Sequence, residues 1–286
     1  MINALSKRFV FFLFLGFSLF SNAQDFQGKA YYVSKTSVNI DDFARPNMNE
    51  EQKKRMKERL KTMFEKTFIL TFNRTESIYK LDEKLEAPNQ GQGGRFGAIM
   101  SGAIDGIKYK NIQSKALLSE HELFGKLFLI KSDLPELNWK MTGETKQIGG
   151  YTCFKATAIK TWKDFDMSSL RRPPNQDEAV NEDTSDEAET EEEDVEITAW
   201  YTMQIPVNQG PGDYWGLPGL ILEINAGETV VLCSKLILNP EDKATIKAPS
   251  KGKEVTKEEY VEIATAKYLE MRENFRRRGG QRGGRG

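Results

Sequence analysis

The stretch Gly210–Glu223 has the sequence GPGDYWGLPGLILE and is the most specific part of the chain. Gly216 and Gly219 permit a positive φ angle or a close approach of two backbones. Pro218, between them, fixes its own φ and offers no backbone N–H for a strand ladder. An apolar run comes directly after it. The stretch therefore predicts a sharp turn that leads into a buried strand.

Two interpretations of this turn remain open. In the first, the motif is purely structural, with Tyr214 and Trp215 packed over the turn. In the second, the turn shapes the rim of an apolar cavity. The structural motif consists of Gly216, Leu217, Pro218, Gly219, Leu220 and Ile221, and the hypothetical cavity rim consists of Tyr214, Trp215, Leu217, Pro218 and Leu220.

Short strand-like segments surround this stretch, at the spacing of roughly 8–12 residues that is typical of antiparallel β architecture. Asn225-Ala226-Gly227 indicates a tight hairpin between the last two of them. The expected strands are residues 26–38, 67–73, 76–81, 108–113, 115–123, 126–131, 140–148, 151–160, 198–204, 220–226 and 229–238.

Two segments have helical periodicity. Residues 49–66 carry acidic residues in the first turn, and their apolar residues recur at helical spacing. Near the C-terminus, Thr256 and Glu259 form a capping-box pattern before an apolar stripe that runs from Tyr260 to Phe275. We expect a mainly β (α+β) fold: a curved antiparallel sheet or half-open barrel, one helix in the N-terminal half and a C-terminal amphipathic helix packed on the sheet.

The N-terminus predicts export. Lys7 and Arg8 precede an apolar run over residues 9–20, and Ser-Asn-Ala at 21–23 places small side chains at a cleavage site. This pattern predicts a signal peptide over residues 1–23. The apolar run is shorter than the roughly 20 residues of a spanning helix, so we expect no transmembrane segment after cleavage. One β-rich domain is expected over residues 24–275.

Three segments are too polar or too rich in glycine to contribute to a core. They are a Gly-rich loop at 87–106, an acidic disordered loop at 175–195 and a disordered Arg/Gly tail at 276–286. The two charged segments are interpreted either as solvated chain or as contacts to envelope partners. The net charge of −1 gives no reason to expect a nucleic-acid partner.

The sequence offers little catalytic chemistry. Its one histidine, His121, lies in a charged segment and is expected at the surface, and motifs such as HExxH and CxxC do not occur. We predict no enzyme, no catalytic or metal-binding residues and no cofactor. Export favours a disulfide between Cys153 and Cys233. The alternative is two buried free thiols on neighbouring strands.

Gly216–Ile221 spells GLPGLI, and it comes after KQIGGYTC at 146–153, AWYT at 199–202 and IP at 205–206. On these residues the chain, over about 24–275, resembles the GLPGLI family of exported Bacteroidetes proteins. The resemblance implies a Gram-negative envelope, so we expect a periplasmic protein, with the cell surface as the alternative. It implies no general biochemical role.

A weaker, fold-level resemblance is to periplasmic lipoprotein carriers, which are half-open barrels with an apolar interior wrapped around helices. It implies that the two helices fill the interior here. The resulting hypothesis is a non-enzymatic binding module with an apolar concavity for a lipid-like ligand. The alternative is an accessory or interaction protein for an outer-membrane partner, without a small ligand.

Overall fold

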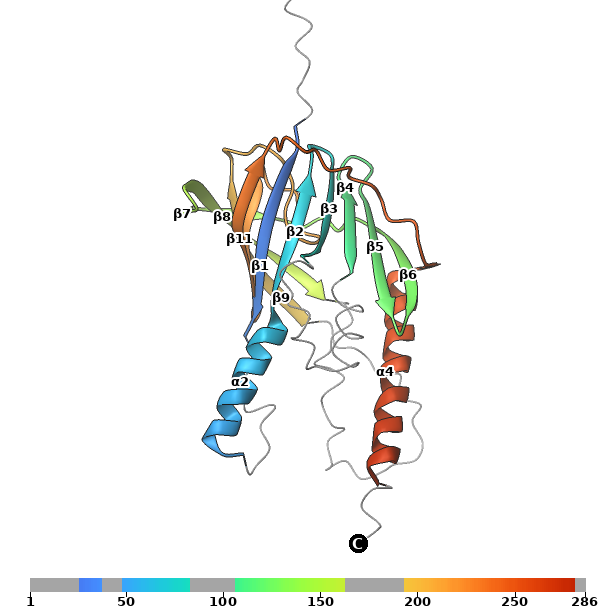
Figure 1. The fold of residues 1–286 in the computed structure, drawn as a ribbon. Helices are drawn as coiled ribbons and strands as arrows, with labels where there is room; N and C mark the ends of the chain where they lie inside the picture. Colours follow the sequence, from blue (N-terminus) through green and yellow to red (C-terminus); the bar gives the residue numbers. More distant parts are fainter. Residues whose placement is uncertain (1–25, 38–47, 83–105, 163–192, 281–286) are drawn as a thin grey trace, which may run out of the picture.

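The computed structural model describes residues 26–37, 48–82, 106–162 and 193–280 (Figure 1). The expected signal peptide lies outside the described residues. So do the acidic loop and the Gly-rich loop, apart from a few residues at their ends, and the last six residues of the Arg/Gly tail.

The described residues form one sheet of twelve strands, in the order β12-β6-β5-β4-β3-β2-β1-β11-β10-β9-β8-β7. Neighbours pair antiparallel except β12 and β6, which are parallel, and the two outermost strands, β12 and β7, do not close the sheet. The strands are β1 (Gly28–Thr36), β2 (Glu65–Phe72), β3 (Glu76–Leu81), β4 (Ile107–Asn111), β5 (Ala116–Leu123), β6 (Lys126–Asp133), β7 (Lys140–Ile148), β8 (Tyr151–Trp162), β9 (Glu193–Thr202), β10 (Leu220–Ala226), β11 (Thr229–Leu238) and β12 (Lys253–Val255).

This architecture confirms the mainly β prediction. Each of the eleven expected strands is present, most of them with shifted ends, and the β10–β11 hairpin closes at Ala226 and Thr229 as the turn residues indicate. The strand that sequence reasoning missed is β12, because three residues are too few to display an alternating pattern.

Both helices begin with reciprocal capping. In α2 (Glu50–Phe64), Asn49 and Gln52 each donate a backbone N–H to the side chain of the other, at 3.0 and 2.8 Å. In α4 (Lys257–Gly280), the expected pair Thr256 and Glu259 does the same. Helix α4 continues to Gly280, so the chain is still helical where the disordered tail was expected to begin, at 276.

The helices do not fill the interior of the sheet, and that expectation was wrong. Figure 1 shows both of them projecting beyond the same end of the sheet. The start of α4 is anchored to the sheet, where Tyr260 and Ala264 pack with Phe128 and Ile130 of β6. Helix α2, with the sequence EEQKKRMKERLKTMF, has too few apolar residues to cover a sheet face.

The connection between β9 and β10, residues 203–219, occupies the inner face instead, and we call it the inner segment. Its residues Ile205 and Val207 share a core cluster with Tyr32, Leu70 and Phe72 of β1 and β2. Its residues Tyr214 and Leu217 share a second cluster with strands β8, β9 and β10. Two of the three core clusters thus lie between the curved sheet and the inner segment, and the third lies where α4 meets the sheet.

Candidate functional site

The inner segment is bonded to itself and to the start of β10. The backbone N–H of Leu220 donates to the carbonyl of Ile205 at 2.9 Å, and the N–H of Ile221 donates to the carbonyl of Gln209 at 3.0 Å. Two stretches of the segment therefore run beside each other, and the GLPGLI motif closes the fold-back. These backbone hydrogen bonds hold the path of the inner segment independently of its side chains.

Gly216 and Gly219 have the two properties predicted for the motif glycines: one has a positive φ angle, and the other lies close to another backbone. Gly216 has φ +93°, a conformation that side-chain-bearing residues rarely adopt. Gly219 approaches the end of β9 so closely that a Cβ there would lie 2.1 Å from the carbonyl oxygen of Thr202. The turn into β10 therefore requires glycine at both positions for different reasons.

The residues expected at a cavity rim do not share one open surface. Tyr214, Leu217 and Leu220 are core residues with exposed fractions of 8%, 1% and 0%. Trp215 is half-buried and donates its indole N–H to the carbonyl of Pro135 at 2.6 Å. Pro218 is exposed. A ligand would reach the first three only if the inner segment moved away, so their geometry favours the structural interpretation.

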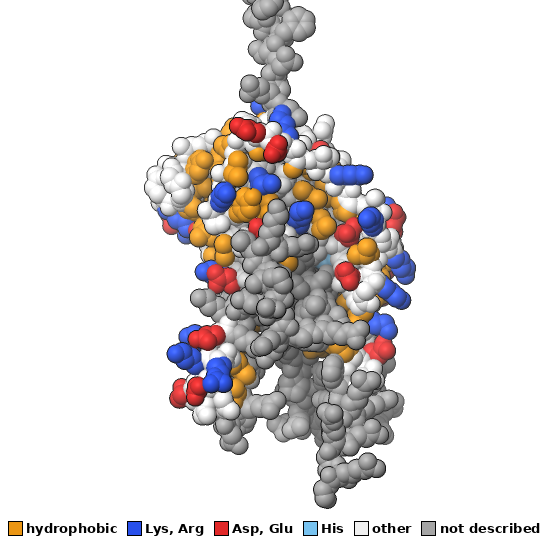
Figure 2. All heavy atoms as spheres, viewed as in Figure 1, with side chains coloured by type: hydrophobic (Ala, Val, Ile, Leu, Met, Phe, Trp, Pro, Cys, Tyr) orange, Lys and Arg blue, Asp and Glu red, His pale blue; other side chains and the backbone are white. Residues whose placement is uncertain are grey.

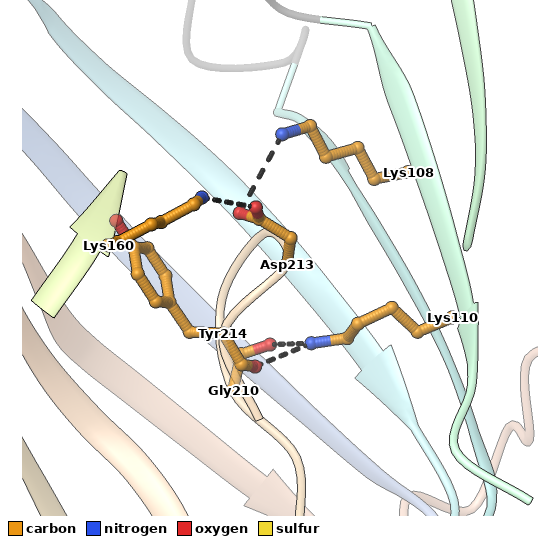
Figure 3. A network of polar contacts seen from close by, with 6 residues as sticks. All are labelled: Lys108, Lys110, Lys160, Gly210, Asp213 and Tyr214. Atoms are coloured by element: carbon orange, nitrogen blue, oxygen red, sulfur yellow. Dashed lines mark hydrogen bonds and ion pairs between the residues drawn. The ribbon is translucent and has the colours of Figure 1, made fainter. Parts of the chain in front are cut away.

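A buried lysine fastens the inner segment to the sheet. Lys110 of β4 has an exposed fraction of 1%, and its Nζ donates to the carbonyl oxygens of Gly210 and Tyr214, each at 2.7 Å (Figure 3). Burial lowers the pKa of Lys110 to about 7, against the opposing effect of the Asp213 charge. The neutral amine still has two N–H groups, enough for both carbonyls.

A second contact lies beside the first. The carboxylate of Asp213 is 2.6 Å from Nζ of Lys160 on β8 and 3.9 Å from Nζ of Lys108 on β4 (Figure 3). Burial alone would raise the pKa of Asp213, but the charges of Lys108 and Lys160 outweigh it and hold the pKa well below its usual range. The carboxylate therefore stays ionised and joins the inner segment to two distant strands.

Sequence reasoning did not find these four charged residues. One signal was available, since Asp213 is the single charged residue between Gly210 and Leu222 and sits among Gly, Pro and aromatic neighbours. Buried charges are almost always paired, so an acid in such a setting predicts a basic partner. Nothing in IKYKN at 107–111 distinguishes inward lysines from solvated ones.

The cysteines do not form the expected disulfide. Cys153 of β8 and Cys233 of β11 are free thiols, and two strands, β9 and β10, lie between theirs in the sheet. A disulfide needs Cα atoms within about 7 Å, which this separation does not provide. The strands are not neighbours either, as the free-thiol alternative supposed. Burial raises the pKa of each thiol to about 11, so both are protonated and unreactive near neutral pH.

His121 was expected at the surface, and this was wrong. It is buried with an exposed fraction of 8%, and its ring centroid lies 5.2 Å from that of Tyr260 in α4. Within the described ranges no cluster of three or more His, Cys, Asp or Glu side chains could hold a metal ion. No helix in the same ranges is long and apolar enough to cross a membrane.

The comparisons with known proteins agree with the motif. Residues 139–223, from the start of β7 into β10, match the model of a family described as a protein of unknown function (Porph_ging). This match confirms the resemblance to the GLPGLI-type family, whose motif lies inside the matched residues. No curated protein matches the chain in sequence.

Two solved structures of PNGF-II, in the C2 and P21 space groups, are similar to most of the chain. Their TM-scores are 0.46 and 0.45, at 14% and 15% identity, over 84% and 83% of this chain. The chain corresponds to about a third of PNGF-II, 32% and 33%. Likeness of this degree carries no functional argument.

Proposed function

We propose that this chain is a non-enzymatic binding protein of the bacterial envelope that docks on anionic lipid surfaces through the outer face of β1, β2 and β11. The observation that carries the proposal is the mixture of apolar and cationic side chains on that face, which we call the outer patch. Its residues are Tyr31, Val33, Ile69, Val230 and Leu232, with Lys29, Lys35 and Lys235.

Strand alternation supports the apolar part of the outer patch. On β1, Tyr31 and Val33 point away from the core, because their neighbours Ala30 and Tyr32 are fully buried. Val33 pairs with Leu232 across the β1–β11 ladder. Leu232 and Val230 remain 39% and 38% exposed. Figure 2 shows hydrophobic side chains interspersed with lysines over these strands.

The lysines give the outer patch an excess of positive charge. Lys35 is paired with Glu65 at 3.1 Å, and Nζ of Lys235 lies 5.3 Å from the ring centroid of Tyr31. Lys29 belongs to the same side of β1 by alternation. A lysine near an anionic membrane contributes about 1 kcal/mol. Three lysines and a few half-exposed aliphatic groups suit weak, reversible adsorption of the whole face.

This proposal moves the lipid-like ligand from the inner face to the outer face. The inner segment already occupies the concavity that a carrier would keep open for an acyl chain. An outer-membrane protein without a small ligand is the competing partner. In that case the chain would bind the surface of the outer-membrane protein, and binding would not require anionic lipid.

Vesicle co-sedimentation tests the proposal. The chain starting at Gln24 is mixed with phosphatidylcholine vesicles, with and without phosphatidylglycerol, at low and high salt. We expect binding only with the anionic lipid and weaker binding at high salt. Replacing Val230 and Leu232 together by Asp should reduce binding at least tenfold.

The matched control is Ile159→Asp on β8, since Ile159 is 62% exposed and outside the outer patch. Equal losses in the double variant and in Ile159→Asp would refute the outer patch as the docking face. Failure to bind anionic vesicles, together with specific capture of one outer-membrane protein from solubilised envelopes, would favour the competing partner.

A further inference from the structure

Two buried polar side chains, one on β3 and one on the inner segment, lack hydrogen-bond partners within the described ranges. Gln209 has an exposed fraction of 0%, and neither its amide nitrogen nor its amide oxygen has a hydrogen-bond partner in the described part of the chain. The hydroxyl of Ser77, in a residue that is 1% exposed, has none there either. Unpaired polar groups in a core are costly, so each calls for a partner.

One of these residues is a ladder partner of Lys110, and the other is the sequence neighbour of a residue that Lys110 binds. Ser77 of β3 pairs with Lys110 of β4, so their side chains stand on the same face of the sheet, roughly 5 Å apart at Cβ. Gln209 precedes Gly210, whose carbonyl accepts a hydrogen bond from Nζ of Lys110. Ser77 thus belongs to the sheet beside Lys110, and Gln209 belongs to the inner segment that Lys110 binds.

The hydrogen-bond donors and acceptors of Gln209 and Ser77 determine which kind of ligand could pair with them. The amide oxygen of Gln209 needs a donor, its amide nitrogen needs an acceptor, and the hydroxyl of Ser77 can serve as either. A simple anion only accepts and a metal ion only attracts lone pairs, so each would leave one end of the Gln209 amide unpaired. A buried water both donates and accepts, and typically makes about three hydrogen bonds.

We infer that Ser77, Lys110 and Gln209 line an internal binding site for water that joins the inner segment to β3 and β4. The site is separate from the outer patch and does not depend on lipid binding. It also explains how a lysine can be enclosed on this face: bound water gives Nζ a further partner beside the two carbonyls. The depressed pKa of Lys110 is consistent with such enclosure.

The thermal unfolding midpoints of two variants should shift in opposite directions depending on whether water bridges these groups or not. If water bridges these groups, Ser77→Ala and Gln209→Leu each remove a partner of the bound water. The unfolding midpoint should then fall by roughly 2–6 °C. If the groups are dry and unpaired, the same changes remove a penalty and the midpoint should rise. The control Gln113→Leu, at an exposed position, should leave the midpoint unchanged.

A high-resolution crystal structure of the protein is the second readout. Ordered water within hydrogen-bond distance of both the Gln209 amide and the Ser77 hydroxyl, with a lowered midpoint in the variants, is the expected result. A dry site, or a midpoint that rises, overturns the inference. If Gln209→Leu does not fold, Ser77→Ala, the smaller change, decides the sign.

Discussion

The inner segment and the outer patch both contain apolar side chains, which are buried in the first and partly exposed in the second. In the inner segment and the strand after it, Leu217 and Leu220 are 1% and 0% exposed. In the outer patch, Val230 and Leu232 are 38% and 39% exposed. The inner segment is held by backbone bonds, by a glycine contact and by Lys110. The most distinctive sequence of the chain therefore builds the core, while a less distinctive face remains exposed.

The largest loss of stability should come from adding a side chain at Gly219, where two backbones lie close together. In Gly219→Ala, the new Cβ would meet backbone atoms of Thr202, which cannot rotate away as a side chain could. We expect a loss of about 3 kcal/mol in the free energy of unfolding, at the upper end of overpacking effects. Urea unfolding followed by tryptophan fluorescence measures it.

The matched control is Gly143→Ala on β7. Nothing lies within 4 Å of a Cβ there, and only the positive φ of +80° opposes the change. A loss of about 1–2 kcal/mol is expected. If the two variants were equally stable, the contact between Gly219 and Thr202 would not be what fixes the turn.

Removing the lysine should be nearly as damaging. Lys110→Met retains the length of the side chain but leaves the buried carbonyls of Gly210 and Tyr214 without their donor. An unpaired buried carbonyl costs at least about 1 kcal/mol, so with two of them we expect a loss of roughly 2 kcal/mol. The control Lys126→Met, at an exposed position of β6, should change stability by less than about 0.5 kcal/mol. Equal effects of the two would contradict the fastening role.

The same lysine should make stability depend on pH. In the folded chain its pKa is about 7, below the ordinary value of 10.5, so the unfolded chain binds more protons between these values. The free energy of unfolding should therefore rise with pH from 7 to about 8.5. Above pH 9 the thiols, whose pKa values are raised from 9.0 to about 11, act in the opposite direction. In Lys110→Met we expect the free energy of unfolding, measured with urea, to stay constant between pH 7 and about 8.5. A wild-type slope in that variant would exclude Lys110 as the cause.

Local patterns sufficed for the strands and caps because alternation and capping depend on residues close in sequence. Local patterns could not predict which residues pack on the inner face of the sheet. Lys110 meets Gly210 a hundred positions away, which no local pattern reveals. Ladder irregularities between Tyr31 and Tyr32 and between Ile221 and Glu223 also change which residues face inward. The disulfide prediction was wrong for a similar reason, because the expected export of the chain does not determine how far apart the strands of the two cysteines lie.

The smallest effect on stability should come from the outer patch. Val230→Ser alters a side chain that is already 38% exposed, so the free energy of unfolding should change by less than about 0.5 kcal/mol. Its adsorption to anionic vesicles should nevertheless weaken. A large loss of stability here would mean that this face is part of the core and would remove the contrast between the two regions.

Hydrogen exchange with and without phosphatidylglycerol vesicles tests the central claim most directly. We predict added protection of β1 and β11, residues 28–36 and 229–238, and unchanged exchange over residues 203–221. Added protection or opening of residues 203–221, with β1 and β11 unaffected, would contradict the account and return the binding function to the GLPGLI segment.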